Sequence, residues 1–242
     1  MMEDNRRKIY PGYGRVFCYA STYAKISIDN YCRAKELYNS IVEANYDSLN
    51  LDEGIRCKFF DHVIVSVVFS AMAIEAFIND YAASCIGDDL YYQNFDHLSV
   101  IGKLQLISSF ILKTEFDRTS SCYSYVKEIF SARDKFVHSK SQSAYAFFKK
   151  NNLSFFEESE ECEYEFDPDD WRIMDKNELN EEFKLCKTAI KAMRNITSYF
   201  DGIDSNCYAY FRLLGFGSIT EQEEDIKTVI ADFSITDINN AK

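Results

Sequence analysis

Two residues near the end of a predicted helix could carry out proton-transfer chemistry. Arg133 and His138 lie five positions apart in SARDKFVHSK, residues 131–140. A histidine exchanges a proton near neutral pH, and an arginine can hold negative charge on a reacting group. The same two residues also occur as ordinary neighbours in helical proteins. The helices around Arg133 and His138 therefore decide whether the two residues form a functional site.

The composition favours a helical protein with a sizeable core. The chain has 242 residues, of which 47% are hydrophobic, and it contains only two prolines and eight glycines. Periodic apolar spacing with so few helix breakers is typical of long helices joined by short connections. We predict an all-α fold, a bundle of helices that forms a single helical domain over residues 1–242.

The net charge and the cysteines indicate how the protein binds partners and in which compartment it is found. The net charge of −12 disfavours a protein that grips nucleic acid through a general cationic surface. The eight cysteines include no C-x-x-C pair, which suits a reducing cytoplasm better than a disulfide framework or a zinc site. The first residues, MMEDNRRKIYPGYG, contain no apolar core of a secretory signal. We expect a cytoplasmic protein.

Apolar spacing predicts the helices that would position the pair. We expect helices at 16–47, 54–85, 99–111 and about 120–138, so that core helices fill residues 16–140, and a further core helix within 176–201. Residues 54–85 are apolar on nearly every face, as in a central buried helix. Their longest apolar run, 63–74, is too short to span a bilayer, so we expect no membrane contact.

The last core helix has the clearest pattern. Asp175 and Glu178 resemble a capping box, and apolar residues follow at helical spacing: Leu179, Phe183, Cys186, Ile190, Met193 and Phe200. Residues 141–174 are expected as an acidic insertion, because 157–170 hold nine carboxylates and no basic residue. A solvated loop is one interpretation, and an acidic segment that folds over a basic surface and restrains activity is the other. Residues 203–242 are expected as an extension with one or two more helices.

Two charges fall on apolar helix faces. Arg133 lies near the centre of one stripe, made by Cys122, Val126, Ile129, Phe130, Phe136 and Val137. Glu75 lies within another, made by Ile64, Val68, Ala71, Ile78 and Ala82. Because burying an unpaired ion costs several kcal/mol, we predict that the two helices pack with Glu75 near Arg133, with Asn79 one turn further on. A purely structural salt bridge is the alternative interpretation.

The geometry of Arg133 and His138 bears on how they could work together. His138 lies one turn beyond Asp134, whose carboxylate could accept a hydrogen bond from the imidazole. On a regular helix Arg133 and His138 point about 140° apart. They converge either through distortion at the helix end or across a two-fold axis, where a second copy of the helix approaches. We expect a homodimer.

The segment YVKEIFSARDKFVHSK, residues 125–140, resembles the Arg-x4-6-His signature helix of the HEPN (higher eukaryotes and prokaryotes nucleotide-binding) superfamily. The matching residues are Arg133, Asp134, Val137, His138 and Lys140. AMAIEAFINDYA (71–82) is similar to the second-helix segment of many bacterial members, and LSVIGKLQLI (98–107) resembles the helix between them. Asp134 stands where an asparagine is most common in the superfamily.

The resemblance implies an up-and-down helical bundle of HEPN type and a metal-independent endoribonuclease without a cofactor. Many catalytic members of the superfamily act as toxins or as antiviral and abortive-infection effectors, with a site composed across a homodimer. Arg133 and His138 would be catalytic, supported by Asp134, Glu75 and Asn79. The alternative is a non-catalytic HEPN-like module that binds a nucleotide, RNA or a protein partner.

Local charge permits RNA binding beside this pair. Residues 127–150 carry a net charge of +4, from Lys127, Arg133, Lys135, Lys140, Lys149 and Lys150 against Glu128 and Asp134. We predict that Lys135 and Lys140 contact RNA. A cognate antitoxin or another regulatory protein is a further expected partner.

Overall fold

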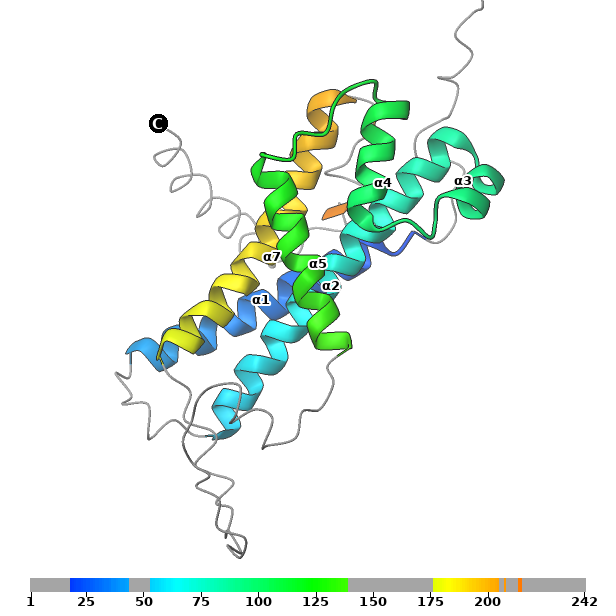
Figure 1. Cartoon of the computed structure of the whole chain (residues 1–242). Helices are drawn as coiled ribbons and strands as arrows, with labels where there is room; N and C mark the ends of the chain where they lie inside the picture. The colour runs from blue at the N-terminus through cyan, green and yellow to red at the C-terminus, as the bar shows by residue number, and fades with distance from the viewer. Residues whose placement is uncertain (1–17, 44–52, 139–175, 205–206, 208–212, 215–242) are drawn as a thin grey trace, which may run out of the picture.

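The computed structural model describes residues 18–43, 53–138, 176–204, 207 and 213–214. All secondary structure in these ranges is helical, so the all-α prediction is confirmed (Figure 1). The elements are α1 (Ala20–Glu43), α2 (Glu53–Ile86), α3 (Asp88–Asn94), α4 (Val100–Leu106), the π-helical turn η2 (Ile107–Ile111), α5 (Ser121–Val137) and α7 (Lys176–Ile203).

Four long helices, α1, α2, α5 and α7, form the body of the described molecule. In chain order each of them runs opposite to the one before (Figure 1). α2 packs against each of the other three, and α5 packs against α7. The short helices α3 and α4 lie beside the C-terminal half of α2 (Figure 1). α2 is therefore the central element around which the others assemble.

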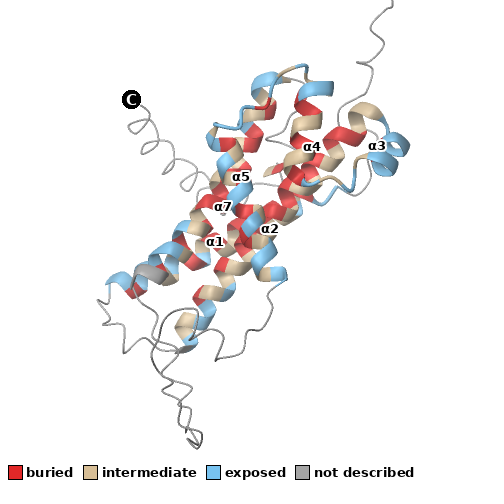
Figure 2. Ribbon diagram, in the orientation of Figure 1, coloured by how far each residue is buried: buried red, intermediate tan, exposed pale blue. Residues whose placement is uncertain are grey.

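The buried residues face inward from all four long helices (Figure 2). Phe59 and Phe77 on α2, Ile129 on α5, and Met193 and Phe200 on α7 are fully buried. Because protein interiors are close-packed, these contacts fix the rotation of each helix about its axis.

The predicted apolar face of α7 is confirmed at every position. Its members are all at most 5% exposed: Leu179, Phe183, Cys186, Ile190, Met193 and Phe200. The helix continues beyond the predicted end, to Ile203. The proposed cap at Asp175, the acidic insertion 141–174 and most of the C-terminal extension 203–242 lie outside the described residues.

Small side chains line the contact between α1 and α2. Ala20, Ala24 and Ala34 on α1 are fully buried. Between them the Ser27 hydroxyl donates a 2.8 Å hydrogen bond to the backbone carbonyl of Ser66 on α2. This bond satisfies a buried hydroxyl and fixes the position of one helix along the other.

α2 is long and apolar enough to cross a membrane by length and composition alone. The stretch Gly54–Ile86 has 33 residues and a mean hydropathy of 1.7 in its most apolar window, half of which is buried inside the bundle. The central helix of a soluble protein passes the same test. The apolar run 63–74 is short, but the whole helix passes this test, so the absence of membrane contact stays a prediction.

The helix predicted at 99–111 begins as expected and then changes form. The Ser99 hydroxyl accepts a hydrogen bond from the Gly102 amide at 3.2 Å, which caps α4. From Ile107 the chain winds as a π-helical turn, closed by a 2.9 Å bond from the Leu112 amide to the Ile107 carbonyl. Periodicity also gave no indication of α3.

Candidate functional site

Arg133 lies between two carboxylates at the contact of α5 with α2. Its Nη1 donates to Oε2 of Glu75 at 3.1 Å, so the predicted contact between Glu75 and Arg133 is present. Its Nη2 and Nε donate to Oδ1 of Asp134 at 2.7 and 3.0 Å. The arginine side chain keeps 27% of its surface exposed. The guanidinium is thus held in one place on a side chain that stays partly exposed.

An aromatic ring completes the support of Arg133. The guanidinium carbon Cζ lies 4.9 Å from the centre of the Phe130 ring, within the range of a cation–π contact. Phe130 precedes Arg133 by three positions, so both side chains lie on one side of α5. Three carboxylate hydrogen bonds and one ring contact restrict the guanidinium from different directions.

The buried face of α5 is rotated relative to the prediction. Cys122, Val126 and Ile129 are buried as expected, but Ala132 is buried as well, and Val137 is 57% exposed. The face is therefore turned toward Ala132 and away from Val137. Arg133 consequently lies off the centre of the buried face, in the last turns of α5, and its side chain stays partly exposed.

Lys103 of α4 is a member of the cluster that sequence reasoning missed. Its side chain is only 2% exposed, and its ammonium lies 3.3 Å from Oε1 of Glu75 and 3.0 Å from Oδ1 of Asn79. Asp96 contributes a carboxylate at 3.6 Å. A signal existed, because a lysine within SVIGKLQLI lies beside the apolar positions of that helix.

Asn79 supports the cluster through Lys103 rather than through Arg133. Its Oδ1 accepts the bond from Lys103 and a 2.6 Å bond from the Tyr91 hydroxyl of α3. Burial raises the pKa of Tyr91, so its hydroxyl stays protonated and remains a donor. The polar cluster thus consists of side chains from α2, α4 and α5, with Tyr91 connecting it to α3.

His138 lies at the C-terminal cap of α5, with φ −109° and ψ 25°, and its side chain is exposed. Its backbone amide donates to the Asp134 carbonyl at 3.0 Å. Among the described residues no hydrogen bond joins the imidazole to the Asp134 carboxylate, whose Oδ1 accepts from Nε and Nη2 of the adjacent Arg133. Within the described ranges no hydrogen bond or ion pair joins Arg133 to His138. α5 stays regular through Val137, so any distortion is limited to His138.

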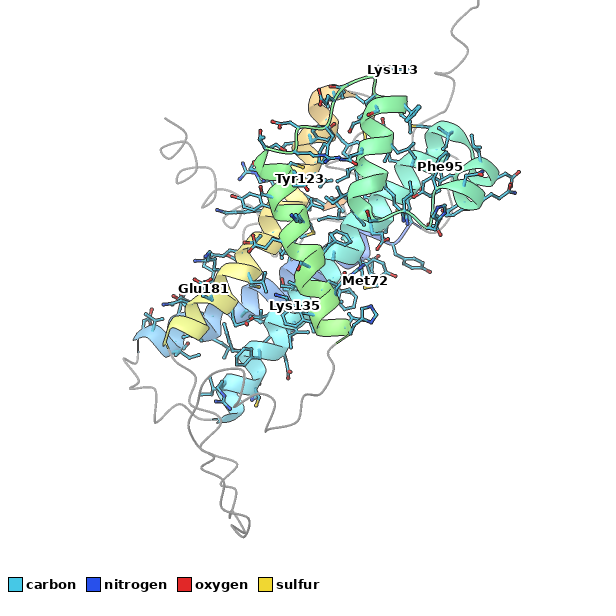
Figure 3. All side chains as sticks on the ribbon, in the orientation of Figure 1. Met72, Phe95, Lys113, Tyr123, Lys135 and Glu181 are labelled. Atoms are coloured by element: carbon cyan, nitrogen blue, oxygen red, sulfur yellow. The ribbon has the colours of Figure 1, made fainter. Side chains whose placement is uncertain are left out.

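Of the two lysines predicted to contact RNA, the structure describes one. Lys135, labelled in Figure 3, is exposed on α5, and Lys140 lies outside the described residues. In the part of the chain that the structure describes, no three His, Cys, Asp or Glu side chains are grouped so as to hold a metal ion. Independence of metal and of any cofactor stays a prediction.

The fold and cluster define an all-α protein with a polar network of charged side chains where α2, α4 and α5 meet. Comparisons of the chain with protein-family models, with curated proteins and with solved structures found no match. The likeness to the HEPN superfamily therefore rests on the residues themselves.

Proposed function

We propose that the protein is a metal-independent endoribonuclease of HEPN type, an up-and-down bundle that acts as a cytoplasmic homodimer. One observation carries the proposal. The end of α5 presents a half-buried arginine, fixed by Glu75, Asp134 and Phe130, together with an exposed histidine on the same helix. A role as a toxin or an abortive-infection effector follows from the same resemblance.

The chemistry assigns a separate step to each residue. Three of the five guanidinium N–H groups of Arg133 are donated to carboxylates, and among the described residues the other two have no acceptor. These two can bind a phosphodiester oxygen and stabilise the charge that develops on it. His138 takes the proton of the ribose 2′-hydroxyl as the 2′-oxygen attacks phosphorus and the bond from phosphorus to the 5′-oxygen breaks. The His138 imidazolium formed in this way gives the proton to the leaving 5′-oxygen.

A second copy of the chain brings the two residues to one phosphate. Within one chain Arg133 and His138 make no described contact, and the helix between them is regular to Val137. Val137, beside His138, is 57% exposed and supplies one apolar side chain for a contact between two copies. A two-fold axis there places the His138 of one subunit near the Arg133 of the other. Lys135 and Lys140 are proposed to bind the RNA strand.

A non-catalytic role is the second candidate, and the ion pairs of Arg133 favour it. Glu75 and Asp134 together neutralise the guanidinium, as in a salt bridge that only holds α5 against α2. In that case the protein is a HEPN-like module that binds a nucleotide, RNA or a protein partner such as an antitoxin.

Cleavage of total cellular RNA in EDTA separates the two candidates. The parent is compared with His138→Ala and Arg133→Ala, and with His97→Ala as the matched control, since His97 is another exposed histidine. Circular dichroism and melting establish that each variant is folded. The proposal expects cleavage by the parent and by His97→Ala alone. If the parent and all three variants are inactive, or if all four cleave RNA equally, the result supports the non-catalytic binding module.

Mixing the two inactive variants tests the composite site. If Arg133 and His138 act from different subunits, a dimer of one Arg133→Ala chain and one His138→Ala chain contains one intact site. Random exchange of subunits then restores about a quarter of the parent activity. No recovery after exchange, or a monomeric mass at high concentration, would contradict the composite site.

A further inference from the structure

Lys103 is a buried cation to which the proposed reaction gives no role. Its side chain is 2% exposed and contacts Glu75, Asn79 and Asp96. Lysine is rarely buried without a partner, and a buried ion pair often stabilises a fold no better than apolar side chains of the same size. Stability alone is therefore a weak reason for a lysine at this position.

The two oxygens of Glu75 are used by different cations. Oε1 lies 3.3 Å from the Lys103 ammonium, and Oε2 lies 3.1 Å from Nη1 of Arg133. An arginine and a carboxylate without other partners favour a bidentate pair, in which both oxygens bind the guanidinium. Lys103 holds one oxygen and thereby limits Glu75 to a single bond with Arg133. This leaves guanidinium N–H groups for another acceptor.

Lys103 also balances the charge around Arg133. Arg133 and Lys103 carry two positive charges, and Glu75 and Asp134 carry two negative ones. Among the described residues Asp96 pairs with Lys103, at 3.6 Å, and not with Arg133, so it is left out of the charges that surround the guanidinium. Without Lys103 the arginine would face two carboxylates alone. The site would then have an excess of negative charge and repel a phosphate.

We propose that Lys103 is a positioning residue for Arg133, which keeps Glu75 singly bonded to the guanidinium and the site attractive to the phosphodiester of RNA. Asn79 and Tyr91 hold the ammonium in place from α2 and α3. The substrate in this inference rests on the proposed function, whereas the effect of Lys103 on the guanidinium does not depend on it.

A charge cycle tests the inference. Lys103→Met gives the four-residue site a net charge of −1, Glu75→Gln gives +1, and the double variant returns it to zero. Binding is measured with a 2′-O-methyl oligoribonucleotide, which has no 2′-hydroxyl to react and so stays intact. We expect binding about tenfold weaker for Lys103→Met, tighter than the parent for Glu75→Gln, and within about twofold of the parent for the double variant. Lys103→Arg, which keeps the charge, should bind like the parent.

A second readout follows the guanidinium directly. The Nε–H resonance of Arg133, assigned by its absence in Arg133→Lys, should shift in Lys103→Met and return toward its parent position in the double variant. A lysine that serves only the fold would change the melting temperature without this pattern. Binding by folded Lys103→Met equal to that of the parent, or a double variant as weak as Lys103→Met, would overturn the inference.

The two proposals fail in different ways. If the parent neither binds nor cuts RNA, the proposed function fails, and the Arg133 resonance alone decides the role of Lys103: an unshifted signal in Lys103→Met overturns it. If Lys103→Met does not fold, Glu75→Gln and the double variant still differ by one charge. The inference then expects tighter binding for Glu75→Gln, and equal binding by the two would overturn it.

Discussion

Replacing Glu75 by glutamine should lower the melting temperature by several degrees. The carboxylate now pairs with Lys103 through one oxygen and with Arg133 through the other. An amide has no charge, and its single oxygen can take the place of only one of the two carboxylate oxygens, so an NH2 group faces the other cation. The other cation then loses its bond to residue 75.

The size of the effect follows from the exposure of the three side chains. Removing one partner of a fully buried pair costs about 3–5 kcal/mol. Glu75 is 32% and Arg133 27% exposed, so solvent screens their pair, and Lys103 retains Asn79 as an acceptor. We therefore expect about 2 kcal/mol. For a chain of this size that loss corresponds to about 4–8 °C.

Thermal unfolding followed by circular dichroism at pH 7 measures the shift, and Glu181→Gln is the matched control. Glu181, labelled in Figure 3, pairs with Lys184 on α7 at 3.2 Å, but these side chains are 70% and 67% exposed. Loss of that pair should cost about 0.3 kcal/mol, which is about 1 °C. A Glu75→Gln protein that melts within a degree of the control would refute the reasoning about the cluster.

Three further changes test the helices around the site. Ser120→Ala removes the hydroxyl that caps α5 by accepting a 3.2 Å hydrogen bond from the Tyr123 amide, so the melting temperature should fall by about 2–4 °C. Ser124 is exposed on the same helix, and the control Ser124→Ala should change the melting temperature by less than about 1 °C. Burial raises the pKa of the Cys186 thiol to about 12, so iodoacetamide at pH 8 should leave Cys186 unmodified and alkylate the exposed Cys57. Peptide masses that show alkylated Cys186 and unmodified Cys57 would contradict the packing of α7. Burial lowers the pKa of His62 below 6.5 in the folded protein, so its contribution to stability is present above pH 6.5 and is lost as the pH falls through the lower, folded-state value. His62→Gln should make the melting temperature less dependent on pH between about pH 6.5 and 5. An unchanged pH dependence of the melting temperature would contradict this prediction.

The contact between Glu75 and Arg133 could be predicted because opposite charges on the apolar faces of two long helices have to be satisfied by each other. Helices of this length repeat their apolar pattern several times, which fixes the direction of each side chain. The same repetition explains why the buried face of α7 matched the prediction from Leu179 to Phe200.

The rest of the cluster depends on contacts that periodicity does not contain. Asp134 was assigned to His138, four positions away, but the long arginine side chain at 133 reaches the carboxylate of its neighbour. α3 has seven residues, which is less than two full turns and too short to show a period. Lys103 could be placed on α4, but its distance from Glu75 depends on how the connection through α3 returns the chain to α2.

The position of α7 in the chain has a consequence for the order of folding. In the unfolded protein, bringing α1 and α2 together closes a loop of residues 44–52, whereas bringing α5 and α7 together closes a loop of residues 138–175. The second loop is about four times as long, so its closure costs about 1 kcal/mol more in entropy. Yet α7 supplies Met193 and Phe200 to the core. We expect the α1–α2 pair to form early and α7 to dock last. Met193→Ala should then mainly speed unfolding, while Val67→Ala on α2 should slow folding, and stopped-flow kinetics with the opposite pattern would exclude this order. Until α7 docks, the aromatic core of the bundle has one side open to water.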